Sequence, residues 1–221
     1  MILYGNSLSP FVRKVLAYAA EKGLALDLQA GGMGAGGPEF LEASPFRKMP
    51  AFRDPGAAAD GGDFTICDST AIITYLEAKY PAPELIPADP EARARTIWFE
   101  EFADTILFGC GSKMFFNRLV SPRFLKQPGD LALADKAEHE DLPPILDYLE
   151  RTIPDSGYLV ADRMTLADIA VASPFANLDY LGVRADPATH PRTAAYVDAM
   201  LARPSYAEIV AGDRAFLART A

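Results

Sequence analysis

The segment Ser9-Pro10-Phe11 contains residue types that can stabilise a negative charge at the start of a helix. Serine is a favoured N-cap, and proline fits the first helical position because no backbone N–H is needed there. The amides of a first helical turn carry partial positive charge, so an anion, including a thiolate, is stabilised just beyond Ser9. Ser9 is therefore a candidate for the activation of a thiol. The alternative is that Ser9 only caps the helix.

The first eighty residues alternate strand-like and helix-like patterns, and these elements must position Ser9. Apolar runs predict strands, and apolar positions at helical spacing predict helices. The expected strands are 2–4, 24–28, 51–53 and 64–67, and the expected helices are 10–22, 39–43 and 68–79. This order is that of a thioredoxin-like α/β fold, so we predict such a domain over residues 1–80.

Four prolines within residues 81–90 indicate a linker, because so dense a proline run cannot continue a helix. The rest of the chain, 91–221, shows no convincing strand pattern and is predicted to be an all-α helical bundle. Its expected helices are 91–118, 131–151 with a kink or restart at Pro143-Pro144, one opened by a capping box at Thr165 to Asp168 and bent at Pro174, 192–202 and 205–217.

Composition narrows the class of protein. The chain has 221 residues and is 50% hydrophobic, which is enough for a buried core in one large or two small domains. Its formal net charge of -9 argues against nucleic-acid binding, which needs clustered Lys and Arg. An acidic ligand would need positive groups placed locally.

Nothing in the sequence indicates export or a membrane span. Met1 enters an apolar run without a signal peptide, and no apolar run reaches the roughly 18 residues that a spanning helix needs. Cys67 and Cys110 are the only cysteines, which suits a reducing compartment, so we expect a soluble cytoplasmic protein. The two histidines and two cysteines show no metal-ligand spacing, and we predict no metal.

A thioredoxin-like half, a proline-rich joint and a helical half together resemble the soluble glutathione S-transferase family, over essentially the whole chain. Ser9-Pro10-Phe11, followed by Arg13, is similar to the helix start of a bacterial-like member with a tau- or omega-like motif. Thr165 to Asp168 and Arg203-Pro204 match marks of the helical domain. The resemblance implies the glutathione S-transferase fold, with glutathione bound by the first domain as a cosubstrate.

The resemblance implies that Ser9 acts on the glutathione thiol. Its hydroxyl would donate a hydrogen bond to the sulfur and favour thiolate over thiol, so serine would orient and ionise the thiol without becoming a nucleophile itself. Ser7 is the alternative donor, because it lies in the loop only two residues earlier.

Two further segments acquire roles from the resemblance. Met49-Pro50 resembles the family's cis-proline turn, which would pair the Met49 backbone with the peptide ligand. Lys48 would meet the glycyl carboxylate, or else be solvated. Asp68 and Ser69, at the start of a helix, would hold the γ-glutamyl end of glutathione, or else only cap that helix.

An electrophile pocket is expected between the two halves, lined by the long first helix of the helical half. Cys110 on that helix would line this pocket or else pack in the bundle. Aromatic and apolar side chains would suit a hydrophobic electrophile, although such residues at helical spacing commonly form the core. The candidates are Phe11, Trp98, Phe102, Thr105, Phe108 and Lys113. The resemblance also implies a homodimer.

The resulting hypothesis is a detoxifying transferase that adds the glutathione thiolate to an electrophilic carbon. A thiol transferase would need cysteine where Ser9 stands, because only sulfur forms the mixed disulfide. A glutathione-dependent isomerase or peroxidase could use the same thiolate. A non-catalytic binding or regulatory protein is the alternative from another class, since a fold does not dictate a reaction.

Overall fold

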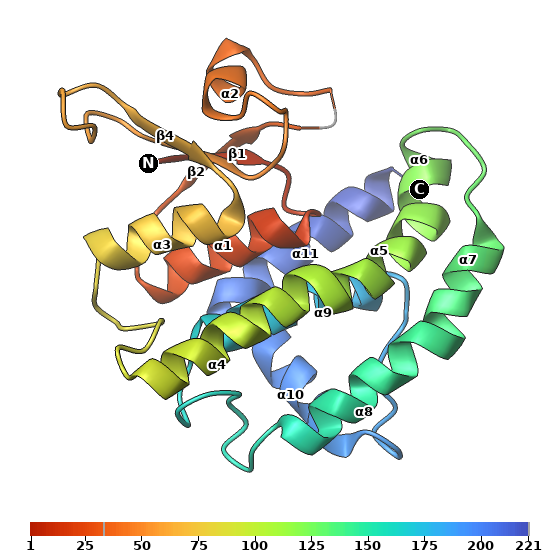
Figure 1. Ribbon diagram of the computed structural model, residues 1–221. Helices are drawn as coiled ribbons and strands as arrows, with labels where there is room; N and C mark the ends of the chain where they lie inside the picture. The colour runs from red at the N-terminus through yellow and green to blue at the C-terminus, as the bar shows by residue number, and fades with distance from the viewer. Residues whose placement is uncertain (33, 221) are drawn as a thin grey trace. The chain divides into compact units, whose positions relative to one another are not determined.

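The structure is a computed structural model that describes residues 1–32 and 34–220 (Figure 1). Its contacts divide the chain into two compact units, residues 1–85 and 86–221, and the division falls inside the proline-rich segment 81–90. The first unit combines a sheet with helices, and the described part of the second contains helices only. The predicted order of an α/β unit followed by an all-α unit is therefore confirmed.

The sheet of the first unit has four strands in the order β2-β1-β3-β4. They are β1 (Ile2–Gly5), β2 (Asp27–Ala30), β3 (Ala51–Asp54) and β4 (Phe64–Cys67). β1 is parallel to β2 and antiparallel to β3, and β3 is antiparallel to β4. Figure 1 shows α1 (Pro10–Glu21) and α3 (Ser69–Lys79) on one side of this sheet and α2 (Pro38–Ala43) on the other.

The second strand begins later than the predicted range 24–28, so its predicted bounds were wrong. The Leu24 N–H donates to the Ala19 carbonyl at 2.8 Å and still belongs to the end of α1. Gly23 turns the chain there at φ 69°, a left-handed conformation that glycine adopts without a Cβ clash. Pairing with β1 therefore starts only at Asp27.

A buried ion pair joins the helices of the first unit to the segment that follows them. Lys22 Nζ lies 2.5 Å from Glu77 Oε2 and donates to the carbonyls of Tyr80 and Pro83 at 2.8 and 2.6 Å. Tyr18 also donates to Glu77, and burial together with this carboxylate raises the pKa of Tyr18. This polar cluster, in which the Lys22 ammonium has three acceptors, thus joins α1, α3 and the segment that follows α3.

The helical unit begins with one long helical run that continues past residue 118, where the sequence pattern predicted its end. α4 (Pro90–Glu101) passes through the π-helical segment η1 (Phe102–Leu107) into α5 (Phe108–Phe115), η2 (Phe116–Val120) and α6 (Ser121–Arg123). Gly109 and Gly111 lie inside α5 and do not end it. The start is capped by Asp89, whose carboxylate accepts from the Ala92 N–H at 2.9 Å.

The second helical run is uninterrupted and passes through a π-helical segment just before Pro143-Pro144, where the sequence pattern predicted a kink or restart. It consists of α7 (Leu131–Lys136), η3 (Ala137–Asp141) and α8 (Leu142–Thr152). Both prolines lie in the first turn of α8, where a missing N–H is tolerated. The remaining helices are α9 (Leu166–Tyr180), α10 (Pro191–Leu201) and α11 (Pro204–Arg219).

The predicted capping box at the start of α9 is confirmed. Thr165 Oγ1 accepts from the Ala167 N–H at 3.2 Å, and Asp168 Oδ2 accepts from the Thr165 N–H at 3.0 Å. Asp168 Oδ1 also accepts from the Leu159 N–H at 2.9 Å. Burial nevertheless outweighs these donors and raises the pKa of Asp168 to about 6. α9 itself is buried along most of its length and packs against α4, α5 and α10.

Candidate functional site

The three segments with predicted ligand contacts lie at the same end of the four-stranded sheet. Tyr4 of β1 pairs with Ala51 of β3, and Ala51 pairs with Cys67 of β4. The first segment follows β1, the second precedes β3 and the third follows β4. Because β1 and β4 both run antiparallel to β3, all three segments leave the sheet at one edge.

Ser9 is the N-cap of α1, but its hydroxyl makes no capping hydrogen bond to the described residues. Its main chain is fixed at both ends: its N–H donates to the Asn6 carbonyl at 2.9 Å, and its carbonyl accepts from the Arg13 N–H at 2.9 Å. The half-buried side chain is thus placed at the positive end of α1 by backbone bonds alone. Ser7 lies in the preceding turn and is also half-buried.

The segment before β3 is a rigid turn that ends in a cis peptide bond between Met49 and Pro50, as predicted. The buried Ser44 side chain fixes it, because Ser44 Oγ accepts from the Lys48 N–H at 2.9 Å and donates to the Lys48 carbonyl at 2.7 Å. The Arg47 N–H donates to the Ser44 carbonyl at 2.9 Å. The backbone on the N-terminal side of Met49 is therefore held in one conformation.

Asp68 connects the second segment to the third. Its N–H donates to the Pro50 carbonyl at 3.2 Å, and its Oδ1 accepts from the N–H groups of Thr70 and Ala71 at 2.9 and 3.1 Å. Asp68 thus does cap α3, while no donor among the described residues reaches Oδ2. Its φ of 87° is uncommon for a residue other than glycine, and such conformations are concentrated at functional sites. Ser69 next to it is buried.

Two adjacent cations, Arg47 and Lys48, lie beside this edge of the sheet. Both are exposed, and neither forms an ion pair with another residue of the described ranges. In a chain of net charge -9 they supply the local positive charge that an acidic ligand requires. Sequence reasoning missed Arg47, although its position next to Lys48 could have indicated it.

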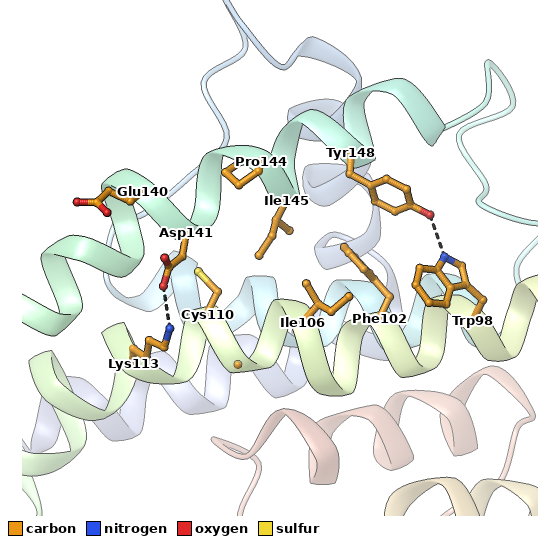
Figure 2. A pocket seen from close by; sticks show the side chains of 11 residues that line it. Trp98, Phe102, Ile106, Cys110, Lys113, Glu140, Asp141, Pro144, Ile145 and Tyr148 are labelled. Carbon is orange, nitrogen blue, oxygen red and sulfur yellow. Dashed lines mark hydrogen bonds and ion pairs between the residues drawn. The ribbon is translucent and has the colours of Figure 1, made fainter.

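The helical unit contains an open groove of about 750 Å³ between its first two helical runs. Figure 2 shows the lining side chains pointing toward one another from the two runs. One wall consists of Trp98, Phe102, Ile106, Gly109, Cys110 and Lys113, and the other of Glu140, Asp141, Pro144, Ile145 and Tyr148. The middle of the groove is apolar and aromatic.

Each end of the groove is closed by a polar contact. Trp98 Nε1 donates to the Tyr148 hydroxyl at 2.8 Å, and Lys113 Nζ lies 2.7 Å from Asp141 Oδ2 (Figure 2). The buried Cys110 thiol donates to the Ala137 carbonyl at 3.4 Å. Burial, assisted by the Asp141 charge, raises the pKa of Cys110 to about 11, so this thiol stays protonated at neutral pH and is a poor nucleophile.

Comparison with known proteins decides the family. Residues 3–84 match the glutathione S-transferase N-terminal domain, and residues 118–211 match the C-terminal domain of the same family. The chain belongs to the glutathione S-transferase family. It is 30% identical to a glutathione S-transferase of Hyoscyamus muticus, over 95% of this chain and 97% of the relative. It is 32% identical to glutathione S-transferase 3 of Zea mays, over 95% and 92%.

A solved structure supports the same family fold. Glutathione S-transferase-I bound with lactoylglutathione superposes with a TM-score of 0.79 at 25% identity, covering 95% of this chain and 98% of the other. Both the predicted family and the predicted fold are thereby confirmed for this chain.

The predicted electrophile contacts of this family member do not all lie together. Trp98, Phe102 and Lys113 line the groove, whereas Thr105 and Phe108 do not. The Thr105 hydroxyl instead donates to the Glu101 carbonyl at 2.6 Å. A list read from one helix includes residues from different sides of it, and the π-helical segment η1 changes the rotation per residue.

The remaining predicted contact, Phe11, belongs to the first unit, where Lys14 Nζ lies 5.9 Å from its ring centroid. Sequence reasoning missed the second wall of the groove altogether. No local signal identifies Pro144, Ile145 or Tyr148, because only the packing of α8 against the first helical run makes them lining residues.

In residues 1–32 and 34–220, no three His, Cys, Asp or Glu side chains are grouped as metal ligands would be. Over the same residues, no helix combines the length and the apolar character needed to cross a bilayer.

Proposed function

We propose that this family member binds glutathione at the edge of the first unit's sheet, ionises its thiol and adds the thiolate to a hydrophobic electrophile. The observation that carries the proposal is the Ser9 side chain: its hydroxyl stands at a helix N-terminus and does not cap that helix. The hydroxyl and the helix dipole can therefore both act on an incoming sulfur.

The rest of glutathione matches the chemistry of the neighbouring segments. The Met49 main chain, next to the cis Met49-Pro50 bond, is the proposed strand-like partner of the tripeptide. Lys48 is the proposed contact of the glycyl carboxylate. Asp68 Oδ2 and the start of α3 are proposed to hold the γ-glutamyl amino and carboxylate groups, as a carboxylate and a helix N-terminus respectively would.

The size of the thiolate effect decides what Ser9 can achieve. A thiol with a pKa of about 8.5 is roughly 3% ionised at pH 7, and a pKa lowered by about two units, worth about 2.7 kcal/mol, makes it mostly thiolate. The supply of thiolate then rises about 25-fold. The rate rises less, because nucleophilicity falls with thiol pKa, so positioning of the electrophile supplies the remainder.

We further propose a homodimer that covers the groove of the helical unit. The groove exposes half of Trp98, and Phe46 of the first unit is 84% exposed. Exposed apolar side chains of this kind mark interfaces, and a two-fold interface uses the same patch of both copies. Trp98, Phe102 and Lys113 are thereby assigned to the dimer contact, while Phe11, Thr105 and Phe108 stay as proposed electrophile contacts.

The free cysteines Cys67 and Cys110 suit the reducing cytoplasm that this proposal assumes. A two-part experiment tests the proposed function. Calorimetry with glutathione should give saturable binding at millimolar concentrations or below, and a panel of halonitroarene, epoxide, enone, isothiocyanate and hydroperoxide substrates should show conjugation. Binding without turnover of any substrate would identify a non-catalytic family member. Absence of binding would refute the site itself.

A further inference from the structure

Ser44 occupies an unusual place at the proposed glutathione site. It is fully buried at the end of α2, where its N–H donates to the Phe40 carbonyl at 2.8 Å. Its single hydroxyl satisfies both polar groups of the Lys48 backbone, accepting from the N–H at 2.9 Å and donating to the carbonyl at 2.7 Å. One side chain thus fixes the orientation of the whole residue that precedes Met49.

The turn that Ser44 closes separates buried from exposed side chains. Ser44 is buried, whereas the next four residues, Pro45, Phe46, Arg47 and Lys48, are exposed. Arg47 adopts a left-handed φ of 58°, which is uncommon for a residue with a Cβ and needs support from its surroundings. Ser44 supplies that support on both sides: its carbonyl accepts from the Arg47 N–H, and its hydroxyl bonds both backbone groups of Lys48, the residue that follows.

We infer that Ser44 is a positioning residue for glutathione: it acts through Lys48 to aim the lysine side chain at the glycyl carboxylate. This inference rests on the proposed function. Loss of the hydroxyl leaves the Lys48 N–H and carbonyl without their partner, and the turn relaxes to reach other partners or water. Lys48 then keeps its charge but loses its direction. The thiol end of glutathione, at Ser9, is untouched by this change.

Calorimetry with two ligands tests the inference. Ser44→Ala should weaken binding of glutathione about three- to tenfold, while binding of γ-glutamylcysteine, which lacks the glycine, should stay within about twofold of wild type. At saturating glutathione, kcat should stay equally close to wild type. Ser44→Ala added to Lys48→Ala should cost no further affinity, because the two changes remove one contact.

A matched control separates positioning from general loss of stability. Ser121 is a second buried serine, whose hydroxyl donates to the Gln127 and Pro128 carbonyls at 3.2 and 3.3 Å in the helical unit. Ser121→Ala should lower the unfolding midpoint comparably and leave affinity for both ligands unchanged. If Ser44→Ala fails to fold, Ser44→Cys, with a weaker donor of similar size, should show an intermediate loss for glutathione alone.

The outcomes distinguish the two levels of the proposal. Equal losses for both ligands, or additive losses with Lys48→Ala, would overturn the role of Ser44 while the glutathione site stands. Unchanged affinity in a folded Ser44→Ala or Ser44→Cys would do the same. Failure of the wild-type chain to bind either ligand would refute the proposed function and the role of Ser44 with it.

Discussion

The edge of the sheet and the groove of the helical unit differ in what they are made of. The sheet edge is formed largely by main-chain groups, and each of its segments is fixed by bonds to residues a few positions away, such as Ser44 to Lys48. The groove is formed by side chains from two helical runs that meet only through packing. A binding site made of main-chain groups can be predicted from short sequence motifs. A binding surface made of side chains from two helices depends on how those helices pack in the tertiary fold.

Charge separates the two regions as well. Arg47 and Lys48 at the sheet edge form no ion pair within residues 1–32 and 34–220, whereas Lys113 at the groove is paired with Asp141. Unpaired cations suit an anionic ligand in an acidic chain, and neutralised ends around an aromatic centre suit an apolar partner. The first region is therefore suited to glutathione and the second to another protein surface.

The largest expected effect tests whether the first unit depends on buried polar bonds. Lys22→Met removes the partner of Glu77 and should lower the free energy of unfolding by about 3–5 kcal/mol, since an uncompensated buried charge remains. Lys136→Met, which breaks the surface contacts to Glu140 at 3.3 Å and Asp141 at 3.1 Å, is the matched control and should cost less than about 1 kcal/mol. Urea unfolding followed by circular dichroism measures both. Equal losses of unfolding free energy in the two variants would contradict the expected difference between a buried and an exposed ion pair.

The next effect concerns the helical unit and depends on pH. The pKa of Asp168 is raised to about 6 in the folded chain, above the usual value in the unfolded chain, so its stabilising contribution is complete at low pH and is lost as the pH rises through that window. The stability difference between wild type and Asp168→Asn should therefore fall by about 2–3 kcal/mol between pH 4 and pH 6.5. Urea unfolding of both proteins at these two pH values measures it. A constant difference would show that the hydrogen bonds to Asp168 fully offset the effect of its burial.

A smaller effect distinguishes the groove from the ligand site. Trp98→Ala and Phe46→Ser should each weaken dimer association about tenfold, as truncation of a buried aromatic does. Neither change should alter affinity for glutathione. Sedimentation velocity over a concentration series, with calorimetry alongside, measures both quantities. A monomeric wild type would refute the interface, and a loss of glutathione affinity would refute the separation of the two regions.

The smallest effect probes the exposed cations. Arg47→Ala should weaken glutathione binding about twofold at low salt, and the loss should shrink at about 0.5 M salt, because exposed charges are screened. Lys48→Ala should retain part of its loss at high salt, since it removes a direct contact as well as a charge. Calorimetry with glutathione at the two ionic strengths measures the affinity of both variants. Equal salt dependence of the two variants would mean that Lys48 acts only at a distance.

Short-range chemistry was predictable from the sequence. Ser9-Pro10, Met49-Pro50 and the Thr165 capping box each combine residue types whose backbone preferences are specific, and the structure confirms the helix starts and the cis bond. The later start of β2 was not predictable, because it depends on the bond from Leu24 to Ala19. Of the two walls of the groove, only the one on the first helical run was predictable from the sequence.

The roles of residues in the turn before β3 could not be predicted from the sequence either. Ser44 is an ordinary serine before a proline in the sequence, and its importance appears only when its hydroxyl is seen on both polar groups of Lys48. Arg47 shows its left-handed backbone only in three dimensions. These features arise from the closure of a specific turn, which residue preferences leave open among several conformations.

The measurement that tests the central claim most directly is the thiolate absorbance of bound glutathione as a function of pH, in wild type, Ser9→Ala and Ser7→Ala. We expect a midpoint well below the ordinary thiol value in wild type and Ser7→Ala, and a midpoint about 1–2 pH units higher in Ser9→Ala. An unchanged midpoint in Ser9→Ala, with glutathione still bound, would contradict that claim.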